Sequence, residues 1–112
     1  MNTAEHPVFD RQQLLDRMGG DEELLVEILG IFRDESARML DEVRDAVSSA
    51  DAHKVERSAH SLKGALLNIA AESAAACALE LEDLGREGHL TSSADVLSRL
   101  ESEIASLNEA IA

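Results

Sequence analysis

Aromatic residues, cysteine and proline are nearly absent from this chain of 112 residues. It has two phenylalanines, no tryptophan, no tyrosine, one proline and one cysteine. A composition so poor in aromatic and β-branched runs favours helices over strands. The single cysteine, Cys77, cannot form an internal disulfide and agrees with a reducing compartment. We expect it to act as a small buried hydrophobic residue.

Long apolar runs are missing too. The longest nearly apolar stretch, residues 65–71, contains Asn68 and is far too short to span a bilayer. The N-terminal segment MNTAEHPVFD lacks the basic and then apolar pattern of a secretory signal. These absences predict a cytoplasmic protein.

Basic residues are also scarce. Ten lysines and arginines stand against 23 aspartates and glutamates, so the formal net charge is −13. Phosphate backbones and anionic lipid surfaces repel such a chain, because binding there depends on clustered cations. The charge therefore argues against nucleic acid and membrane as partners.

The sequence does contain residues that typically begin and end helices. Its length suits one domain, which we place over residues 9–112 after a flexible tail over residues 1–8. Asp10, Asp21 and Asp51 are each predicted to cap the start of a helix. The first of these helices runs through Leu15, and Gly19-Gly20 ends it. The next two run to about residues 49 and 69, a fourth covers about 73–84 and ends at Gly85 and Gly88, and Ser92 or Ser93 caps the last.

Apolar residues recur every three or four positions within the long segments, which is typical of amphipathic helices. The positions predicted to face the core are Leu24, Leu25, Ile28, Ile31, Phe32, Met39, Val43, Ala46, Val47, Val55, Ala59, Leu62, Leu66, Ile69, Ala76, Leu79, Leu84, Val96, Leu97, Leu100, Ile104, Leu107 and Ile111. Long helices with short connections pack antiparallel against their neighbours. We therefore expect an all-α fold, an antiparallel up-and-down four-helix bundle with a short additional N-terminal helix. We also expect a monomer.

The segment AHSLKGALLNIAA, residues 59–71, carries the candidate site. At about 100° per residue, His60 lies roughly 160° around its helix from the inward Leu62, so it points outward. The same face carries Glu56 and Arg57 one turn earlier, Lys63 and Gly64 one turn later, and Leu67 two turns later.

These residue types fit phosphoryl chemistry. A neutral imidazole is a competent nucleophile at cytosolic pH. Lys63 can hold a phosphoryl oxygen as a point charge, and its positive field disfavours a second positive charge on His60. Gly64 costs about 1 kcal/mol relative to alanine in a helix interior, so we attribute it to the close approach of another protein. The simpler alternative is a solvated surface histidine beside a solubilising lysine.

The hexapeptide Ala59-His60-Ser61-Leu62-Lys63-Gly64 resembles the mark of the histidine-containing phosphotransfer family, Ala-His-x-Leu-Lys-Gly. The resemblance extends to Asn68 and Ala71, to Cys77, Leu79 and Glu80 in the next helix, and to the opening Phe9-Asp10, Leu14-Leu15, Met18-Gly19-Gly20-Asp21 and Leu24-Leu25. Three residues depart from the family pattern. Leu66 and Leu67 replace small residues, and Ala70 replaces a glycine, which leaves the end of the third helix open.

The resemblance implies a phosphoryl carrier in a multistep two-component phosphorelay, with His60 as the phosphoacceptor. Lys63, Gly64, Arg57, Leu67 and Glu56 would then contact the phosphoryl group or the partner. The implied partners are response-regulator receiver domains, with a hybrid sensor kinase as a further candidate. Mg²⁺ is expected on the receiver domain, and the chain itself needs no cofactor. Since it has no G-x-x-x-x-G-K-[ST] segment, we expect neither ATP binding nor enzyme activity.

Two alternatives stay open beside this interpretation. One is a helical docking module with the same fold whose histidine is not phosphorylated, because Leu67 blocks it. The other is the phosphoacceptor domain of a chemotaxis-type kinase, which carries a similar motif. A metal site is not expected, because the chain has no H-E-x-x-H motif and no histidine with a glutamate three residues before it.

Overall fold

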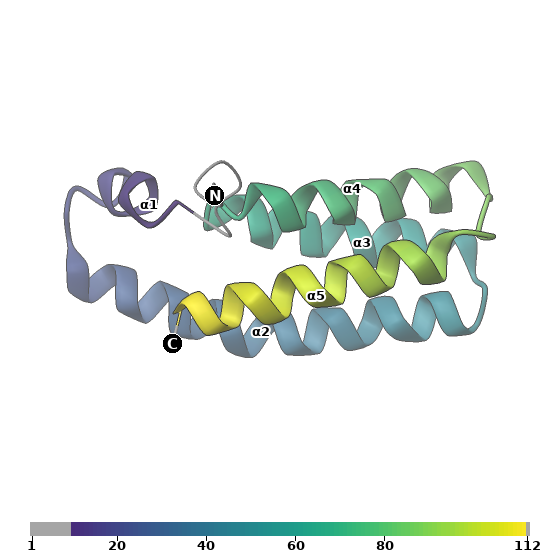
Figure 1. The fold of residues 1–112 in the computed structure, drawn as a ribbon, viewed down its shortest axis with the longest axis horizontal. Helices are drawn as coiled ribbons and strands as arrows, with labels where there is room; N and C mark the ends of the chain where they lie inside the picture. The colour runs from purple at the N-terminus through teal and green to yellow at the C-terminus, as the bar shows by residue number, and fades with distance from the viewer. Residues whose placement is uncertain (1–9, 112) are drawn as a thin grey trace, which may run out of the picture.

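The computed structural model describes residues 10–111, and within that range the chain is helical apart from short connections (Figure 1). The predicted tail over residues 1–8 lies outside the described residues. The five helices are α1 (Arg11–Arg17), α2 (Glu22–Ser48), α3 (Ala52–Asn68), α4 (Glu72–Glu87) and α5 (Ser93–Ile111). The prediction of an all-α fold is confirmed.

The four long helices form a closed antiparallel bundle. Successive helices reverse direction, and contacts join α2 to α3, α3 to α4, α4 to α5 and α5 back to α2 (Figure 1). The most extensive of these contacts is between α3 and α4. The short α1 contacts α2 at one end of the bundle. None of the helices within residues 10–111 is both long enough and apolar enough to cross a membrane.

Aspartate side chains begin three of the helices, as predicted. The carboxylate of Asp10 accepts from the backbone N–H of Gln13 at 2.9 Å, and Asp21 accepts from that of Leu24 at 3.1 Å. Asp51 accepts from Lys54 N–H at 3.2 Å. Each cap satisfies a donor that has no partner within its own helix.

The connections after α2 and α3 are closed by alanines in the left-handed region, Ala50 at φ 55° and Ala70 at φ 61°. At the end of α3, the N–H of Ala71 donates to the carbonyl of Leu66 at 2.9 Å, and that of Ala70 to Leu67 at 3.1 Å. This is the hydrogen-bond pattern that glycine usually completes. Ala70 therefore takes the glycine's conformation, and α3 ends at Asn68.

The predicted core is right for α3 and α5 and partly wrong elsewhere. All five residues predicted to face inward in the third helix are buried, and in α5 only Leu97 and Ile111 are half-buried. In α2, Leu24 and Ile31 are exposed because the buried stripe runs beside them, through Leu25, Leu29 and Phe32. In α4, Ala76 and Leu79 are exposed and Leu84 is half-buried. The buried residues of α4 are Ala74, Ala75, Cys77, Ala78, Leu81, Glu82 and Gly85.

Gly85 explains both errors in the prediction for the fourth helix. Instead of ending the helix, Gly85 is buried inside α4, which runs on to Glu87 and stops at Gly88, with φ 73°. A Cβ on Gly85 would lie 2.5 Å from the backbone nitrogen of Glu56 and 2.7 Å from the carbonyl oxygen of Ala52. The backbones of α3 and α4 therefore meet at this point, so small residues rather than leucines face α3.

Candidate functional site

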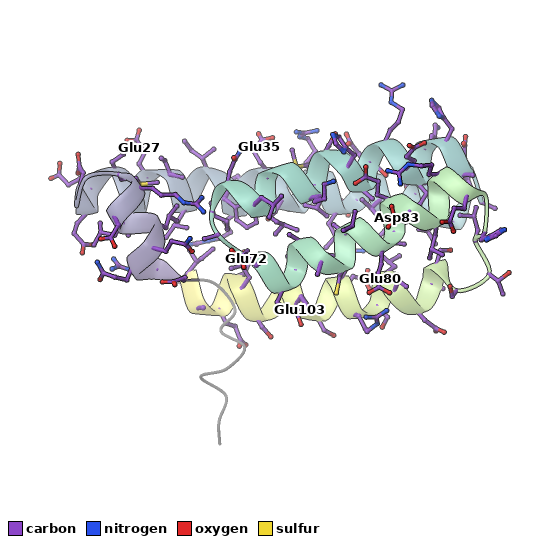
Figure 2. The ribbon with its side chains drawn as sticks, turned by 90° about the horizontal axis from the view of Figure 1, so that it is seen from above. Glu27, Glu35, Glu72, Glu80, Asp83 and Glu103 are labelled. Atoms are coloured by element: carbon purple, nitrogen blue, oxygen red, sulfur yellow. The ribbon has the colours of Figure 1, made fainter. Side chains whose placement is uncertain are left out.

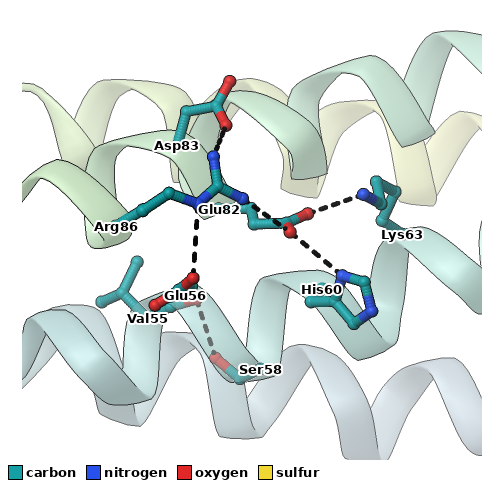
Figure 3. Close-up of polar contacts among 8 residues, drawn as sticks. All are labelled: Val55, Glu56, Ser58, His60, Lys63, Glu82, Asp83 and Arg86. Atoms are coloured by element: carbon teal, nitrogen blue, oxygen red, sulfur yellow. Dashed lines mark hydrogen bonds and ion pairs between the residues drawn. The ribbon is translucent and has the colours of Figure 1, made fainter.

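The site is built around His60, which points outward from α3 as predicted, with 66% of its side chain exposed. Its Nδ1 lies 3.0 Å from Oε2 of Glu82, which comes from α4 (Figure 3). The other ring nitrogen, Nε2, points away from α4. The helix contact at Gly85, less than one turn beyond Glu82, sets the spacing that lets these two side chains meet.

Glu82 is a buried carboxylate surrounded by cationic side chains. Only 7% of its side chain is exposed, its Oε1 lies 2.8 Å from Nζ of Lys63, and its Oε2 lies 3.0 Å from a guanidinium nitrogen of Arg86. Burial by itself raises the pKa of this carboxyl, but the contacts with Lys63 and then with His60 lower it more. The net pKa is below its ordinary value of 4.5, so Glu82 is ionised at neutral pH.

The ionised state of Glu82 assigns the tautomer of His60. A carboxylate can only accept hydrogen bonds, so the proton of the neutral imidazole must be on Nδ1, where it is donated to Oε2. Nε2 then keeps its lone pair and faces solvent. The arrangement leaves Nε2 as the ring nitrogen with a lone pair available for chemistry.

Arg86 contacts three carboxylates around the site. Its guanidinium contacts Glu82 at 3.0 Å, Asp83 at 2.6 Å and Glu56 at 3.4 Å (Figure 3). The hydrogen bond with Asp83 is the first cause of its raised pKa. Since Glu56 belongs to α3, Arg86 links the two helices that carry His60 and Glu82.

The structure brings only some of the predicted site residues together. Lys63 lies beside His60 but is paired with Glu82 instead of acting alone on the imidazole. Glu56 faces Arg86, so it is part of the scaffold between the helices. Gly64 is exposed, and a Cβ there would meet nothing within 4 Å. Packing against a neighbouring helix therefore does not account for this glycine.

Arg57 and Leu67 lie at opposite ends of the outward face of α3. Arg57 is exposed and lines one hollow together with His60, His53 and Glu56. Leu67 is 46% exposed and lines an apolar groove between α3 and α4 that also includes Leu79, Ala75 and Ala76. Leu67 is thus part of a patch rather than an isolated apolar side chain.

Glu82 and Arg86 are the two site residues that the sequence analysis missed. The spacing of Glu82 could have identified it. It lies four residues after Ala78 and three before Gly85, so it shares the helix face of these small buried residues. Arg86 follows one turn later at the spacing of a helical ion pair.

Charge also distinguishes α3 from its neighbours. Acidic side chains are plentiful on the other long helices, and Figure 2 labels Glu27 and Glu35 on α2, Glu80 and Asp83 on α4, and Glu103 on α5. Helix α3 has Glu56 as its one acidic residue against Lys54, Arg57 and Lys63. His60 therefore lies on the basic helix of an acidic protein.

Comparisons with known proteins agree with this geometry. The family model of the Hpt domain matches residues 27–110, which include His60 and Glu82. The crystal structure of histidine-containing phosphotransfer protein B from Pseudomonas aeruginosa PAO1 resembles this one with a TM-score of 0.87 and 27% sequence identity, over 94% of this chain and 91% of that chain. A search of curated proteins finds no match. The chain therefore belongs to the Hpt domain family, whose members act as phosphocarriers in two-component signalling.

Proposed function

We propose that this protein relays a phosphoryl group between aspartates of two receiver domains, and that Nε2 of His60 carries the group in transit. The observation that supports this most strongly is the hydrogen bond from Nδ1 of His60 to the buried Glu82, because it leaves Nε2 unprotonated and exposed. Family membership supports the phosphocarrier role.

The chemistry is an in-line displacement at phosphorus. The Nε2 lone pair forms a bond to phosphorus while the bond to the aspartyl oxygen breaks, and the aspartate leaves as a carboxylate. The imidazole ring, with a proton on Nδ1 and phosphorus on Nε2, then carries a positive charge. Glu82 faces that charge through Nδ1 and stabilises it. The reverse displacement delivers the phosphoryl group to the second receiver.

Neutralising the phosphoryl oxygens is the main demand of such a transfer, and Mg²⁺ usually meets it. We assign the Mg²⁺ ion to the receiver domain, so no metal site is required of this chain. Lys63 holds the Glu82 carboxylate beside the histidine and adds positive charge to the site. The protein accordingly needs no nucleotide and acts as a carrier.

The receiver docks on the outward face of α3. Gly64, one turn after His60, presents no side chain there and has open space above it. The apolar groove at Leu67 and Leu79 continues this face and offers exposed apolar area to a partner. In this arrangement Leu67 supports docking and does not block it.

A two-receiver transfer assay tests the proposal. One receiver domain is labelled on its aspartate, mixed with the protein and Mg²⁺, and then chased with a second, unlabelled receiver. We expect the label to pass through this chain to the second receiver, and His60→Gln to stop it.

The matched control is His53→Gln, which alters another exposed histidine of the same helix. Label that reaches the second receiver through His60→Gln would contradict the proposal. Receiver binding without any phosphate transfer would instead favour the docking-module alternative.

A further inference from the structure

Two cations on α3 flank His60, and they lie in different surroundings. Lys63 is three residues after the histidine and Arg57 three residues before it, so each is about one turn away. The sequence alone predicts that Lys63 holds the phosphoryl oxygens. The contacts of the two side chains point to a different assignment.

Lys63 already has an ionic partner. Its Nζ lies 2.8 Å from Glu82 Oε1, and its side chain is only 21% exposed. Glu82 is more deeply buried still. Turning Lys63 toward a phosphoryl group on Nε2 would deprive a buried carboxylate of a counter-charge, which is costly in a protein interior. Arg86 is similarly occupied, by three carboxylates.

Arg57, by contrast, is available. Among residues 10–111, six lysine and arginine side chains form ion pairs with carboxylates: Arg11, Arg38, Arg44, Lys63, Arg86 and Arg99. Arg57 is not one of these six. Its side chain is exposed, and the neighbouring Glu56 faces Arg86 instead. A flexible guanidinium without a carboxylate partner can turn to a new anion at little cost.

The positions of the two cations around the helix favour the same residue. Nδ1 faces Glu82 and α4, so Nε2 points to the other side of the ring (Figure 3). On the helix, Lys63 lies on the α4 side of His60, while Arg57 lies roughly 60° around from His60 in the opposite sense. Arg57 and His60 line the same hollow, together with Ser61 and Glu82.

We propose that Arg57 is the phosphoryl-binding cation of this protein, and that it contacts the oxygens of the phosphoryl group once that group is bonded to Nε2 of His60. The inference rests on the proposed function and adds a specific subsite to it. In this assignment Lys63 acts through Glu82 as a positioning residue.

The test uses the isolated protein, so that phosphoryl binding is separated from receiver docking. Phosphoramidate serves as the donor: the Nε2 lone pair bonds to phosphorus, the P–N bond of the donor breaks, and ammonia leaves. Phosphorus NMR then follows the titration of the phosphoryl group on His60. A nearby cation favours the dianion, so Arg57→Gln should raise the titration midpoint by roughly half a pH unit.

Two further variants define the specificity of the effect. Arg57→Lys should keep the midpoint near that of the parent protein, because the charge is retained. Lys54→Gln removes the same charge from the same helix, but at a site about 9 Å along the axis from His60 and 120° around it. We expect a clearly smaller rise for Lys54→Gln. Both altered residues are exposed, and circular dichroism checks that each variant is folded.

Equal midpoints for Arg57→Gln and Lys54→Gln would overturn the assignment. A rise in Lys63→Gln that exceeds the rise in Arg57→Gln would overturn it in favour of the lysine. If phosphoramidate labels His60 but no receiver does, the relay function fails while the Arg57 assignment is still decided by the titration. If neither donor labels His60, both claims are wrong.

Discussion

Gly85→Ala is the substitution whose effect the structure predicts most sharply. The added Cβ would lie 2.5 Å from the nitrogen of Glu56, 2.7 Å from the oxygen of Ala52 and 2.9 Å from Cα of Glu56, where ordinary contact begins at 3.4 Å. All three neighbours are backbone atoms, so no side chain can turn aside. The two helices must instead separate by something near 1 Å over their most extensive contact.

The magnitude follows from two opposing effects. Overpacking of this kind costs about 1–3 kcal/mol or more. Alanine is the better helix former by up to about 1 kcal/mol, which offsets part of the cost. We therefore expect Gly85→Ala to lower the free energy of unfolding by about 1–2 kcal/mol, and the thermal midpoint by roughly 4–8 °C.

Gly64→Ala is the matched control, since it makes the same substitution in the adjacent helix where a Cβ meets nothing within 4 Å. It should raise the free energy of unfolding by up to about 1 kcal/mol. Urea denaturation followed by circular dichroism measures both variants. If Gly85→Ala proved as stable as the parent protein, the close approach of α3 and α4 would be wrong, and with it the spacing that joins Glu82 to His60.

The remaining predictions concern the helix ends, the buried carboxylate and the docking face. Ala50→Gly should stabilise the protein by about 1 kcal/mol, because Ala50 is exposed and has a φ of 55°, which glycine adopts without strain. Ala70→Gly should raise the stability less, because a buried methyl group is lost. A lower urea midpoint for Ala50→Gly than for the parent protein would count against this reasoning. The pKa of Glu82 is lowered in the folded state, so its contribution to the free energy of unfolding is fully present above about pH 4.5 and is lost as the pH falls through the folded pKa. The difference in unfolding free energy between the parent protein and Glu82→Gln should therefore shrink in acid. If urea denaturation gave the same difference from pH 7 to pH 3, the charged contacts of Glu82 would be contradicted. Gly64→Gln should stay folded yet slow phosphoryl transfer from a receiver much more than Gly64→Ala does; transfer at the parent rate would show that the glycine provides no clearance.

The parts of the fold that depend on local sequence could be predicted. The caps at Asp10, Asp21 and Asp51 are visible because each depends on residues within one turn. The outward position of His60 follows from the regular geometry of one helix. In both cases the controlling interactions lie within a few residues of each other in the sequence.

The parts of the fold that depend on contacts between helices could not be predicted from the sequence. Gly85 reads as a helix terminator in isolation, and only the approach of α3 shows that it is a packing position. Glu82 reads as one more acid of an acid-rich helix, because its role depends on two residues of α3 that lie about 20 positions earlier. The face of α4 was misassigned for the same reason, since leucine spacing suggests an inward stripe that small residues take over here.

The position of the phosphate on the imidazole tests the role of the contact between His60 and Glu82 most directly. The protein is phosphorylated by a labelled receiver in the presence of Mg²⁺, and nitrogen-15 and phosphorus NMR identify the histidine and the ring nitrogen that carry the group. The contact between Nδ1 and Glu82 predicts a phosphoryl group on Nε2 of His60, with the proton retained on Nδ1. Phosphate on Nδ1 of His60, or mainly on His53 or His89, would contradict it.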